Sequence, residues 1–567
     1  MRDWVSRTFA AMTLEEKVGQ VICYRAAKWA DETIDMARKG LVGCVSPLYY
    51  QGMSDLDNAL EFMNALQDAS PTPVLFLSGW AHEMSNWGTS PLPGAGSAMA
   101  LGAARSPDLA YQFGRIAARE SKAIGFDLVW EPCVDVNTNP QNPIIATRSF
   151  GDRPELVTEM ALAVVRGMQE ERVIPNAKHF PGHGDTSFDT HRTVGTVPHH
   201  RDRLEAVELY PYRHLIPAGL RGVMTVHLIF PALDSNTAVP ATFSRRCIRD
   251  LLRAEMGFKG LIVSDSLTMK AIRDSFSVAE SLVRTFNAGH DILLQDYDEP
   301  PMPSFQALLD AVNDGITPMD VLDAAVLRVL QAKAWVGLPE RGRMAVETAR
   351  EVLRRPEHVA LARCIFESSV TLLENKGLPL KKGVPRICVV GTRAQGEGAV
   401  MTDLAAMAHN NREVLFREFA ARLDGVGTHV LDEDPDSAQI AAAVAATQDS
   451  EIVVFATTPR VESYKPLSAQ VGRGQVQFVK RILAEDKHLC LCVLGSPYVI
   501  SEFPQAPVCL TTYSPDVGAA EAAVRVLFGE VPAAGRLPIT LSERYPFGYG
   551  LSEPPVRHPG ESEAGKS

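Results

Sequence analysis

The sequence predicts an α/β protein in which a TIM (β/α)8-type barrel is followed by a second α/β sandwich domain. Three observations support this prediction. Short apolar runs alternate with amphipathic stretches over roughly the first 340 residues, a polar, glycine-containing break follows at Glu340–Arg343, and a second series of apolar runs begins after it. A chain of 567 residues also exceeds what a single hydrophobic core supports.

Eight candidate strands occupy the first region: Gln20–Tyr24, Gly43–Leu48, Val74–Ser78, Asp127–Glu131, Ile174–His179, Val223–His227, Leu261–Asp265 and Asp291–Gln295. Amphipathic helices are expected between them, among them Leu56–Gln67, Asp108–Ile124, Leu156–Glu171 and Ala279–Ala288. Thr13, followed three residues later by Glu16, predicts a capping box. Eight βα units fit a closed barrel, and an open doubly wound sheet is the alternative.

We assign residues 1–343 to the barrel, 344–380 to a linking helical region, 381–552 to the second domain and 553–567 to a polar tail that we expect to be disordered. A helical pattern covers Val346–Glu374. Further strands are expected at Ile387–Gly391, His429–Leu431, Ile452–Thr457, Leu489–Gly495 and Cys509–Tyr513. The glycine-containing turn Gly391–Gly398 lacks the lysine of a P-loop and the full dinucleotide fingerprint, so we interpret it as a βα turn.

Composition narrows the class of ligand. Lysine and arginine total 56 against 68 aspartate and glutamate, a net charge of −12, and the chain is 46% hydrophobic and 22% charged. This balance argues against a nucleic-acid partner, which needs clustered positive charge. It favours a neutral or small ligand.

The N-terminal residues and the cysteines indicate a cytoplasmic location. Met1–Leu14 lacks the basic and apolar regions of a signal peptide, and no run approaches the roughly 18 apolar residues of a membrane span. The nine cysteines are scattered, which is typical of free thiols in a reducing compartment. A secretion route that leaves no visible signal remains an alternative.

The stretch Lys178–His191 holds three histidines, two aspartates, a lysine and two glycines. Pro181 and the glycines predict a loop. Asp189 and His191, two residues apart, share one face of an extended segment, where the carboxylate orients the imidazole and favours its protonated form. This pair is a candidate acid/base unit. A polar surface loop, or a metal site of His179, His183 and His191, is the alternative.

Polar residues also end the predicted strands. They are Ser78, Glu131, Lys178, His179, His227, Asp265 and Gln295. Active sites of such barrels lie at the carboxyl ends of the strands. Polar groups that end apolar runs need partners or a site, so we expect these side chains to converge on one mouth.

Lys178-His179-Phe180-Pro181-Gly182-His183-Gly184 followed by Asp189-Thr190-His191 closely resembles the signature of glycoside hydrolase family 3, in its β-N-acetylglucosaminidase branch. The resemblance extends to about Ser552 and includes Gly535-Arg536-Leu537-Pro538. It implies a two-domain glycosidase with this fold.

The resemblance also implies roles for individual residues. Ser264-Asp265-Ser266-Leu267-Thr268-Met269 resembles the family's nucleophile block, which makes Asp265 the nucleophile. His191, held by Asp189, would be the acid/base. Arg148, Lys178, His179, His227 and Glu131 would contact the sugar. A loop anchor for Arg148 and a core position for His227 are the plainer alternatives.

One segment departs from the family. After the third strand the branch usually carries an aspartate that holds the terminal sugar's outer hydroxyls, whereas this chain reads Ser78-Gly79-Trp80-Ala81-His82-Glu83. A serine cannot form the charge-assisted hydrogen bonds of a carboxylate. Either His82 or Glu83 substitutes for it, or recognition of the sugar at C4 or C6 is altered.

The predicted function is a retaining, exo-acting glycoside hydrolase that releases terminal β-N-acetylhexosamine, chiefly N-acetylglucosamine, in carbohydrate metabolism and cell wall recycling. The alternatives are a family 3 glycosidase or phosphorylase on another β-glycoside, and a non-catalytic sugar-binding relative. Neither mechanistic role requires a metal, and we predict no cofactor. We expect a small carbohydrate as the partner, with no nucleic acid and no membrane, and the sequence does not give the oligomeric state.

Overall fold

The computed structural model describes residues 2–25, 27–47, 56–78, 98–188, 194–236, 239–267, 269–295, 299–353, 355–381, 386–393, 403–461 and 468–552. Contacts within the chain divide it into two compact units. The first holds residues 1–98 and 106–361, and the second holds residues 99–105 and 362–567. The boundary after residue 361 falls inside the predicted linking region 344–380.

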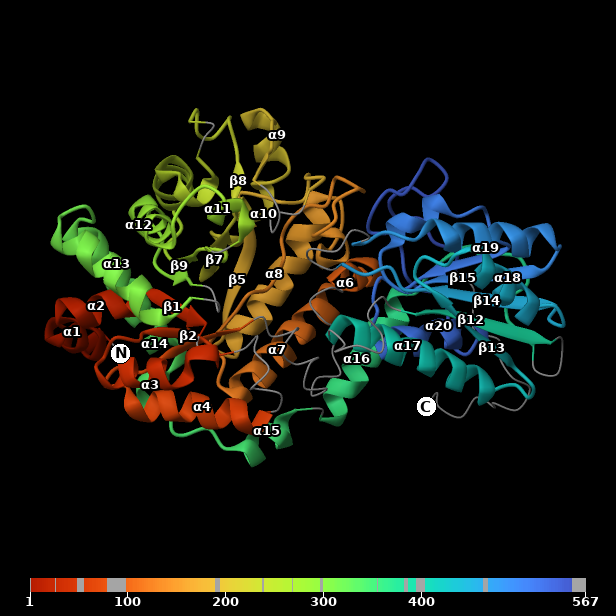
Figure 1. The fold of residues 1–567 in the computed structure, drawn as a ribbon, viewed down its shortest axis with the longest axis horizontal. Helices are drawn as coiled ribbons and strands as arrows, with labels where there is room; N and C mark the ends of the chain where they lie inside the picture. The colour runs from red at the N-terminus through yellow and green to blue at the C-terminus, as the bar shows by residue number, and fades with distance from the viewer. Residues whose placement is uncertain are drawn as a thin grey trace, which may run out of the picture. The chain divides into compact units, whose positions relative to one another are not determined.

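The first unit is built on eight parallel strands in the order β10-β1-β2-β3-β4-β5-β7-β9 (Figure 1). A parallel bridge between Val263 at the end of β9 and Ile292 just before β10 closes the ring. The strands are β1 (Ile22–Arg25), β2 (Cys44–Ser46), β3 (Leu75–Ser78), β4 (Leu128–Val129), β5 (Ile174–Phe180), β7 (Gly222–Thr225), β9 (Leu261–Val263) and β10 (Leu293–Leu294). Each lies in or overlaps one predicted run, so the barrel is confirmed and the open sheet is wrong.

Alternate strand residues fill the interior of the barrel, because successive side chains of a strand point to opposite faces. The core cluster contains Cys23, Cys44, Leu75, Leu77, Leu128, Trp130, Ile174, Met224, Leu261, Val263, Ile292 and Leu294. Every one of the eight strands contributes to it or is flanked by a contributor. The interior is therefore a packed core, with room for a site only at its end.

Helices α7 (Pro107–Ile124) and α8 (Pro154–Glu170) show how the sequence sets helix ends and packing. Ser106 accepts a hydrogen bond from the Leu109 N–H, and Gly125 ends α7 with a φ of 104° that suits glycine. The two helices touch through glycines. A Cβ on Gly114 would lie 2.4 Å from the carbonyl oxygen of Val164.

The other elements of the first unit complete the outer layer. The helices are α1 (Arg2–Ala11), α2 (Leu14–Gln20), α3 (Ala30–Arg38), α4 (Leu56–Ala69), α9 (Arg201–Ala206), α10 (Tyr210–Leu215), α11 (Lys270–Arg273), α12 (Val278–Ala288), α13 (Pro301–Asn313), α14 (Met319–Val336) and α15 (Val346–Val352). A π-helix spans Arg246–Glu255, and β6 (Gly195–Thr196) pairs with β8 (Leu228–Ile229). The predicted capping box of Thr13 and Glu16 starts α2.

The second unit is organised around a six-stranded sheet in the order β11-β16-β15-β14-β12-β13. Its strands are β11 (Thr371–Asn375), β12 (Ile387–Arg393), β13 (Gly427–Asp432), β14 (Ile452–Thr457), β15 (His488–Val493) and β16 (Val508–Thr511). All pairs are parallel except β11 with β16. The predicted second α/β domain is confirmed.

One secondary-structure prediction for this region was wrong. The helix expected over Val346–Glu374 is two helices, α15 and α16 (Pro356–Ser369), and the residues after Ser369 form β11. Thr371 and Leu372 pair with Thr511 and Leu510 of β16. Tertiary pairing with a strand far along the chain decides the conformation here, and the local pattern could not show it.

Four more helices flank the second sheet: α17 (Asp403–Ala420), α18 (Ser437–Ala446), α19 (Arg473–Ala484) and α20 (Val517–Leu527). Helix α17 packs beside α20, and α18 packs beside α19. The short helix α6 (Ala98–Ala104) also contributes to this unit, because the carbonyl oxygen of Ala103 accepts a hydrogen bond from the Arg536 N–H.

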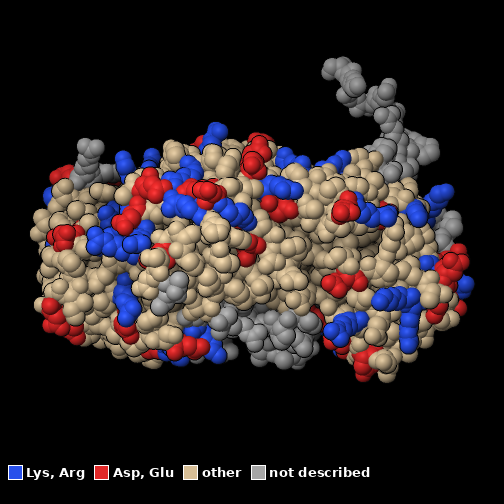
Figure 2. Space-filling view, turned by 90° about the horizontal axis from the view of Figure 1, so that it is seen from above, with Lys and Arg blue, Asp and Glu red and all other residues tan. Residues whose placement is uncertain are grey.

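The surface carries interspersed charges. On the face drawn in Figure 2, basic and acidic side chains lie next to one another among the described residues. Arg213, for example, pairs with both Glu205 and Glu255. Among the described residues, no helix combines the length and apolar character needed to cross a bilayer. The nine cysteines all lie in described stretches and are free thiols.

We predict that Gly114→Ala destabilises the barrel unit by about 1–3 kcal/mol, because the added methyl group forces α7 and α8 apart. All six tryptophans lie between residues 4 and 335, so urea unfolding followed by tryptophan fluorescence reports on this unit. Gly342→Ala is the matched control, since a Cβ there would meet nothing within 4 Å. Equal stabilities of the two variants would contradict the close helix packing.

Candidate active site

The carboxyl ends of the barrel strands bring together most of the described side chains that the sequence indicated. Ser78 ends β3, and Lys178 and His179 lie near the end of β5. Asp265, Glu131 and His227 each follow a strand, β9, β4 and β7 respectively, by two residues. Because parallel strands of a barrel end at one face, these side chains surround a common mouth.

The carboxylate of Asp135, whose side chain has no exposed surface, connects three segments at this mouth. Its Oδ2 atom lies 2.7 Å from Nδ1 of His179 and accepts a hydrogen bond from the Cys133 thiol at 3.2 Å. Its Oδ1 atom accepts a hydrogen bond from the backbone N–H of His183 at 2.7 Å. Both carboxylate oxygens also lie 3.2 Å from the backbone nitrogen of His179. Asp135 therefore fixes the loop that follows β5.

These contacts determine the protonation of His179. Burial alone would raise the pKa of Asp135, but His179 and the N–H donors outweigh burial and hold that pKa far below its usual value. The carboxylate is therefore ionised and only accepts, so Nδ1 of His179 carries the proton. Burial lowers the pKa of His179, although Asp135 and Asp265 oppose it. The ring is neutral near pH 7, which leaves Nε2 as an acceptor.

Asp265 and the residue that follows it are held at the mouth by hydrogen bonds. Its Oδ1 accepts a hydrogen bond from the Ser266 N–H at 2.8 Å. The ring of His227 lies 2.8 Å from the Ser266 carbonyl oxygen through Nε2 and 2.8 Å from Thr242 Oγ1 through Nδ1. Both ring nitrogens of His227 thus contact protein atoms, which makes this buried histidine a support for the segment that carries Asp265.

Lys178, Glu131 and Arg148 add charge beside His179. Nζ of Lys178 lies 3.9 Å from Oε1 of Glu131, and both side chains are largely buried. Arg148 ends a short 3-10 helix, and its guanidinium donates to the Ile144 carbonyl oxygen at 2.9 Å. The charge of Arg148 also lowers the pKa of His179, so it lies near the same site.

Several predicted site residues lie outside the described part of the chain. These are the catalytic candidates Asp189 and His191 and the substrate-binding candidates His82 and Glu83. Ser78, in contrast, lies in the described part of the chain and is fully buried. Its carbonyl oxygen accepts a hydrogen bond from the backbone N–H of Trp130 at 2.9 Å.

Among the described residues, two groups contain three side chains of metal-ligand type. In Cys133, Asp135 and His179, the carboxylate and imidazole already bond to each other, and burial raises the thiol pKa well above normal. In the second group, Asp185 pairs with His199, while Arg203 bonds both carboxylate oxygens of Glu208 at 2.9 and 2.7 Å. Internal hydrogen bonds therefore account for both groups, and we assign no metal to them.

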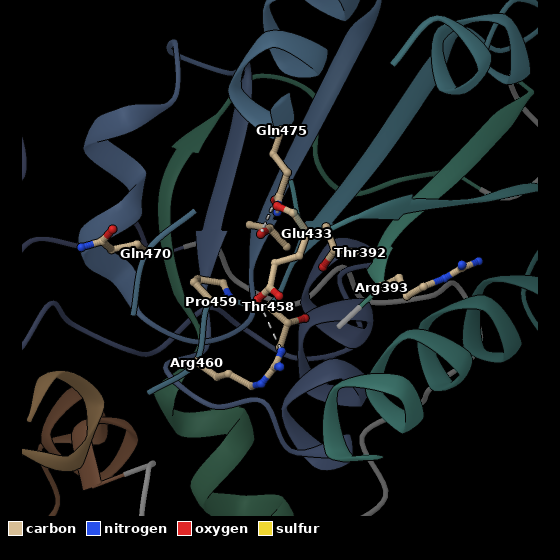
Figure 3. A pocket seen from close by; sticks show the side chains of 9 residues that line it. Thr392, Arg393, Glu433, Thr458, Pro459, Arg460, Gln470 and Gln475 are labelled. Atoms are coloured by element: carbon tan, nitrogen blue, oxygen red, sulfur yellow. Dashed lines mark hydrogen bonds and ion pairs between the residues drawn. The ribbon is translucent and has the colours of Figure 1, made fainter. Parts of the chain in front are cut away.

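The second unit has a polar hollow of its own, at the carboxyl ends of β12, β13 and β14 (Figure 3). Oγ1 of Thr457 donates to Gln475 at 2.7 Å, and Nη1 of the buried Arg460 lies 3.6 Å from Oε1 of Glu433. Thr392 and Arg393 of the predicted βα turn line this hollow. The rest of that turn, from residue 394, lies outside the described residues. These two contacts connect residues that line the hollow.

Asp135 was missed as a site residue by sequence reasoning. It lies between Val134 and Val136, two buried apolar residues that follow β4. A carboxylate inside an apolar run at a strand end is costly to bury without partners, and that signal was present in the sequence. Its partners His179 and His183 lie 44 and 48 residues further on, which the local pattern cannot show.

Comparison with known proteins agrees with this geometry. Residues 13–332 match the family model for the glycosyl hydrolase family 3 N-terminal domain, and residues 370–553 match that for its C-terminal domain. A β-N-acetylglucosaminidase/β-glucosidase of Cellulomonas fimi is 28% identical over 561 residues, 94% of this chain and 95% of that protein. A β-hexosaminidase A of Pseudoalteromonas piscicida is 30% identical over 466 residues, 75% of each chain.

Among solved structures, a family 3 β-N-acetylglucosaminidase from Paenibacillus sp. superposes with a TM-score of 0.82. The two sequences are 28% identical, and the match covers 94% of this chain and 99% of that one. The likeness thus extends over both units and includes the barrel that carries the mouth described above.

We predict that His183→Asn reduces the pH dependence of barrel stability. Burial, reinforced by His179, lowers the pKa of His183 to about 4. The unfolded chain, with an ordinary pKa of about 6.5, therefore binds more protons between these values, and stability falls as pH falls through that window. Between pH 6.5 and 4.5 this loss is about 2 kcal/mol for the parent, and the variant should lack it.

Urea unfolding at the two pH values, followed by tryptophan fluorescence, measures this difference. His200→Asn is the matched control, because His200 is exposed and should keep the parent's pH dependence. A His183→Asn variant whose stability falls as steeply as that of the control would contradict a buried, neutral His183.

Proposed function

Because this chain belongs to glycosyl hydrolase family 3, we propose that it is a retaining, exo-acting glycosidase that releases terminal β-N-acetylhexosamine, chiefly N-acetylglucosamine. The names of the Cellulomonas fimi and Pseudoalteromonas piscicida relatives and of the Paenibacillus structure support this substrate class. Each of the three is named for N-acetylglucosamine or hexosamine.

One observation carries the proposal. Asp265 is a part-exposed carboxylate at the carboxyl end of a barrel strand, and its charge raises the pKa of the His179 ring. The two groups therefore face the same mouth. A carboxylate fixed at a strand end, with hydrogen-bonding side chains at the ends of the neighbouring strands, suits attack on the anomeric carbon of a sugar bound there.

The reaction proceeds in two displacements. Asp265 attacks the anomeric carbon while the bond to the leaving oxygen breaks, and His191 gives that oxygen a proton. His191, oriented by Asp189, then removes a proton from water, which attacks the glycosyl-enzyme and restores the Asp265 carboxylate. Two inversions leave the released sugar in its original β configuration.

The remaining site residues would hold the sugar. Lys178 and Arg148 donate hydrogen bonds, whereas the Nε2 lone pair of neutral His179 accepts one from a hydroxyl group. Glu131 orients Lys178, and His227 supports the segment that carries Asp265 through its contact with the Ser266 carbonyl oxygen. Ser78, with His82 and Glu83, would contribute on the β3 side.

The setting of the reaction is also a proposal. The nine free thiols, eight of them buried, suit a reducing cytoplasm, where an exo-glycosidase of this kind serves carbohydrate metabolism and recycling of cell wall fragments. Assays with and without inorganic phosphate distinguish hydrolysis from phosphorolysis.

We predict that Asp265→Asn lowers kcat on an aryl N-acetyl-β-glucosaminide by about four orders of magnitude or more, because the amide cannot form the glycosyl-enzyme. Stability should remain close to that of the parent, since the side chain is part-exposed. The matched control is Asp250→Asn, an exposed carboxylate in the neighbouring π-helix. Near-normal turnover by Asp265→Asn would rule out this nucleophile.

We predict that His191→Ala loses activity according to the leaving group. A nitrophenolate leaves without a proton, whereas the alkoxide of a disaccharide needs one, so kcat/KM should fall about a hundredfold further on the disaccharide. His200→Ala, which removes an exposed histidine nine residues further along the chain, serves as the control. Equal losses on the two substrates would count against His191 as the proton donor.

A further inference from the structure

A hydrogen bond joins the two ends of the segment that carries the predicted acid/base pair. Asp185 precedes Asp189 by four residues, and His199 follows His191 by eight. Nε2 of His199 is bonded to Oδ2 of Asp185. This contact closes residues 185–199 into a loop, and closing a loop reduces the number of conformations that its residues can adopt.

Two further charged side chains extend this contact. Nη1 of Arg203 donates hydrogen bonds to both carboxylate oxygens of Glu208, at 2.9 and 2.7 Å, and Nη2 of Arg203 lies 3.8 Å from Oδ2 of Asp185. Burial raises the pKa of Glu208, although the charges of Arg203 and His199 oppose this rise, so His199 lies near Glu208 as well. Asp185, His199, Arg203 and Glu208 are called the stem cluster below.

Both ends of the loop are also attached to the barrel. Before the loop, Nδ2 of the buried Asn142 donates hydrogen bonds to the carbonyl oxygens of His183 and Gly184, at 2.9 and 3.2 Å. After it, β6 pairs with β8, which follows barrel strand β7. The bond between Asp185 and His199 connects these two anchored ends directly to each other.

The exposure of the stem cluster argues for a role other than stability. The side chains of Asp185 and His199 are 22% and 30% exposed. Pairs as exposed as this contribute little to the stability of a fold. A general acid, in contrast, depends strongly on its position, because a displacement of about 1 Å can lower a rate about a hundredfold.

We propose that Asp185 and His199 are positioning residues for proton transfer. Their hydrogen bond holds the loop between them so that His191 can give its proton to the leaving oxygen, while Arg203 and Glu208 hold Asp185 in place. The inference rests on the proposed function, because it takes His191 as the proton donor. Asp185 and His199 act through the loop.

The test compares kcat/KM on 4-nitrophenyl N-acetyl-β-glucosaminide with that on N,N′-diacetylchitobiose, whose leaving alkoxide needs a proton. His199→Ala should lower the disaccharide value about tenfold further than the nitrophenyl value, because only the disaccharide depends on a well-placed acid. His199→Gln supplies an amide N–H donor and should recover most of this difference. A role in stability alone would lower the two values equally.

His200→Ala is the matched control, because His200 is the exposed neighbour of His199. Asp185→Ala should reproduce the effect of His199→Ala, and the double variant should lose no more than either single variant, since each removes the same bond. If His199→Ala fails to fold, the comparison of Asp185→Ala with Asp202→Ala, an exposed carboxylate close in sequence, decides the question.

The proposal is overturned if His199→Ala and His200→Ala leave the same ratio of the two activities, or if the losses of the two single variants multiply in the double variant. Failure of the proposed function would look different. A parent chain that hydrolyses neither substrate would contradict that function, whereas a selective loss in His191→Ala without one in His199→Ala would contradict only the positioning role.

Discussion

The buried carboxylate of Asp135 is the interaction on which the mouth of the barrel depends. It accepts hydrogen bonds from Cys133, from the ring and backbone of His179 and from the backbone of His183, in surroundings that exclude water. In a low dielectric such charge-assisted bonds are strong, and losing one partner leaves a charge unpaired. The Asp135 carboxylate therefore sets both the position of the loop after β5 and the tautomer of His179.

Around Asp135, the candidate site residues lie at the ends of different strands and differ in how exposed they are. Asp265, two residues after β9, is part-exposed, and His227 contacts the carbonyl oxygen of the next residue, whereas Ser78 at the end of β3 is fully buried. In the proposed reaction, a sugar bound at the mouth would meet Asp265 at its anomeric carbon. Under the proposed function, the nucleophile and the residues that hold the sugar therefore come from different strands.

The sequence predicted the barrel and the residues at its strand ends because both leave local signals, namely apolar runs and polar residues that end them. The strand β11 was missed because Leu372 and Leu373 fit a helical pattern equally well, and pairing with β16 decides between the two. The role of Asp135 could not be predicted either, because its partners His179 and His183 come from a segment 44 and 48 residues further along the chain. The acid/base pair Asp189 and His191 remains a prediction from the motif alone.

The most direct test of the account is to trap the glycosyl-enzyme. A 5-fluoro derivative of N-acetylglucosaminyl fluoride slows both displacements but keeps a good leaving group, so the intermediate should accumulate. Mass spectrometry of the intact chain and of its peptides should show one glycosyl group per chain, attached to Asp265. A chain that hydrolyses aryl N-acetylglucosaminides yet forms no adduct, or carries the adduct on another residue, would contradict the account.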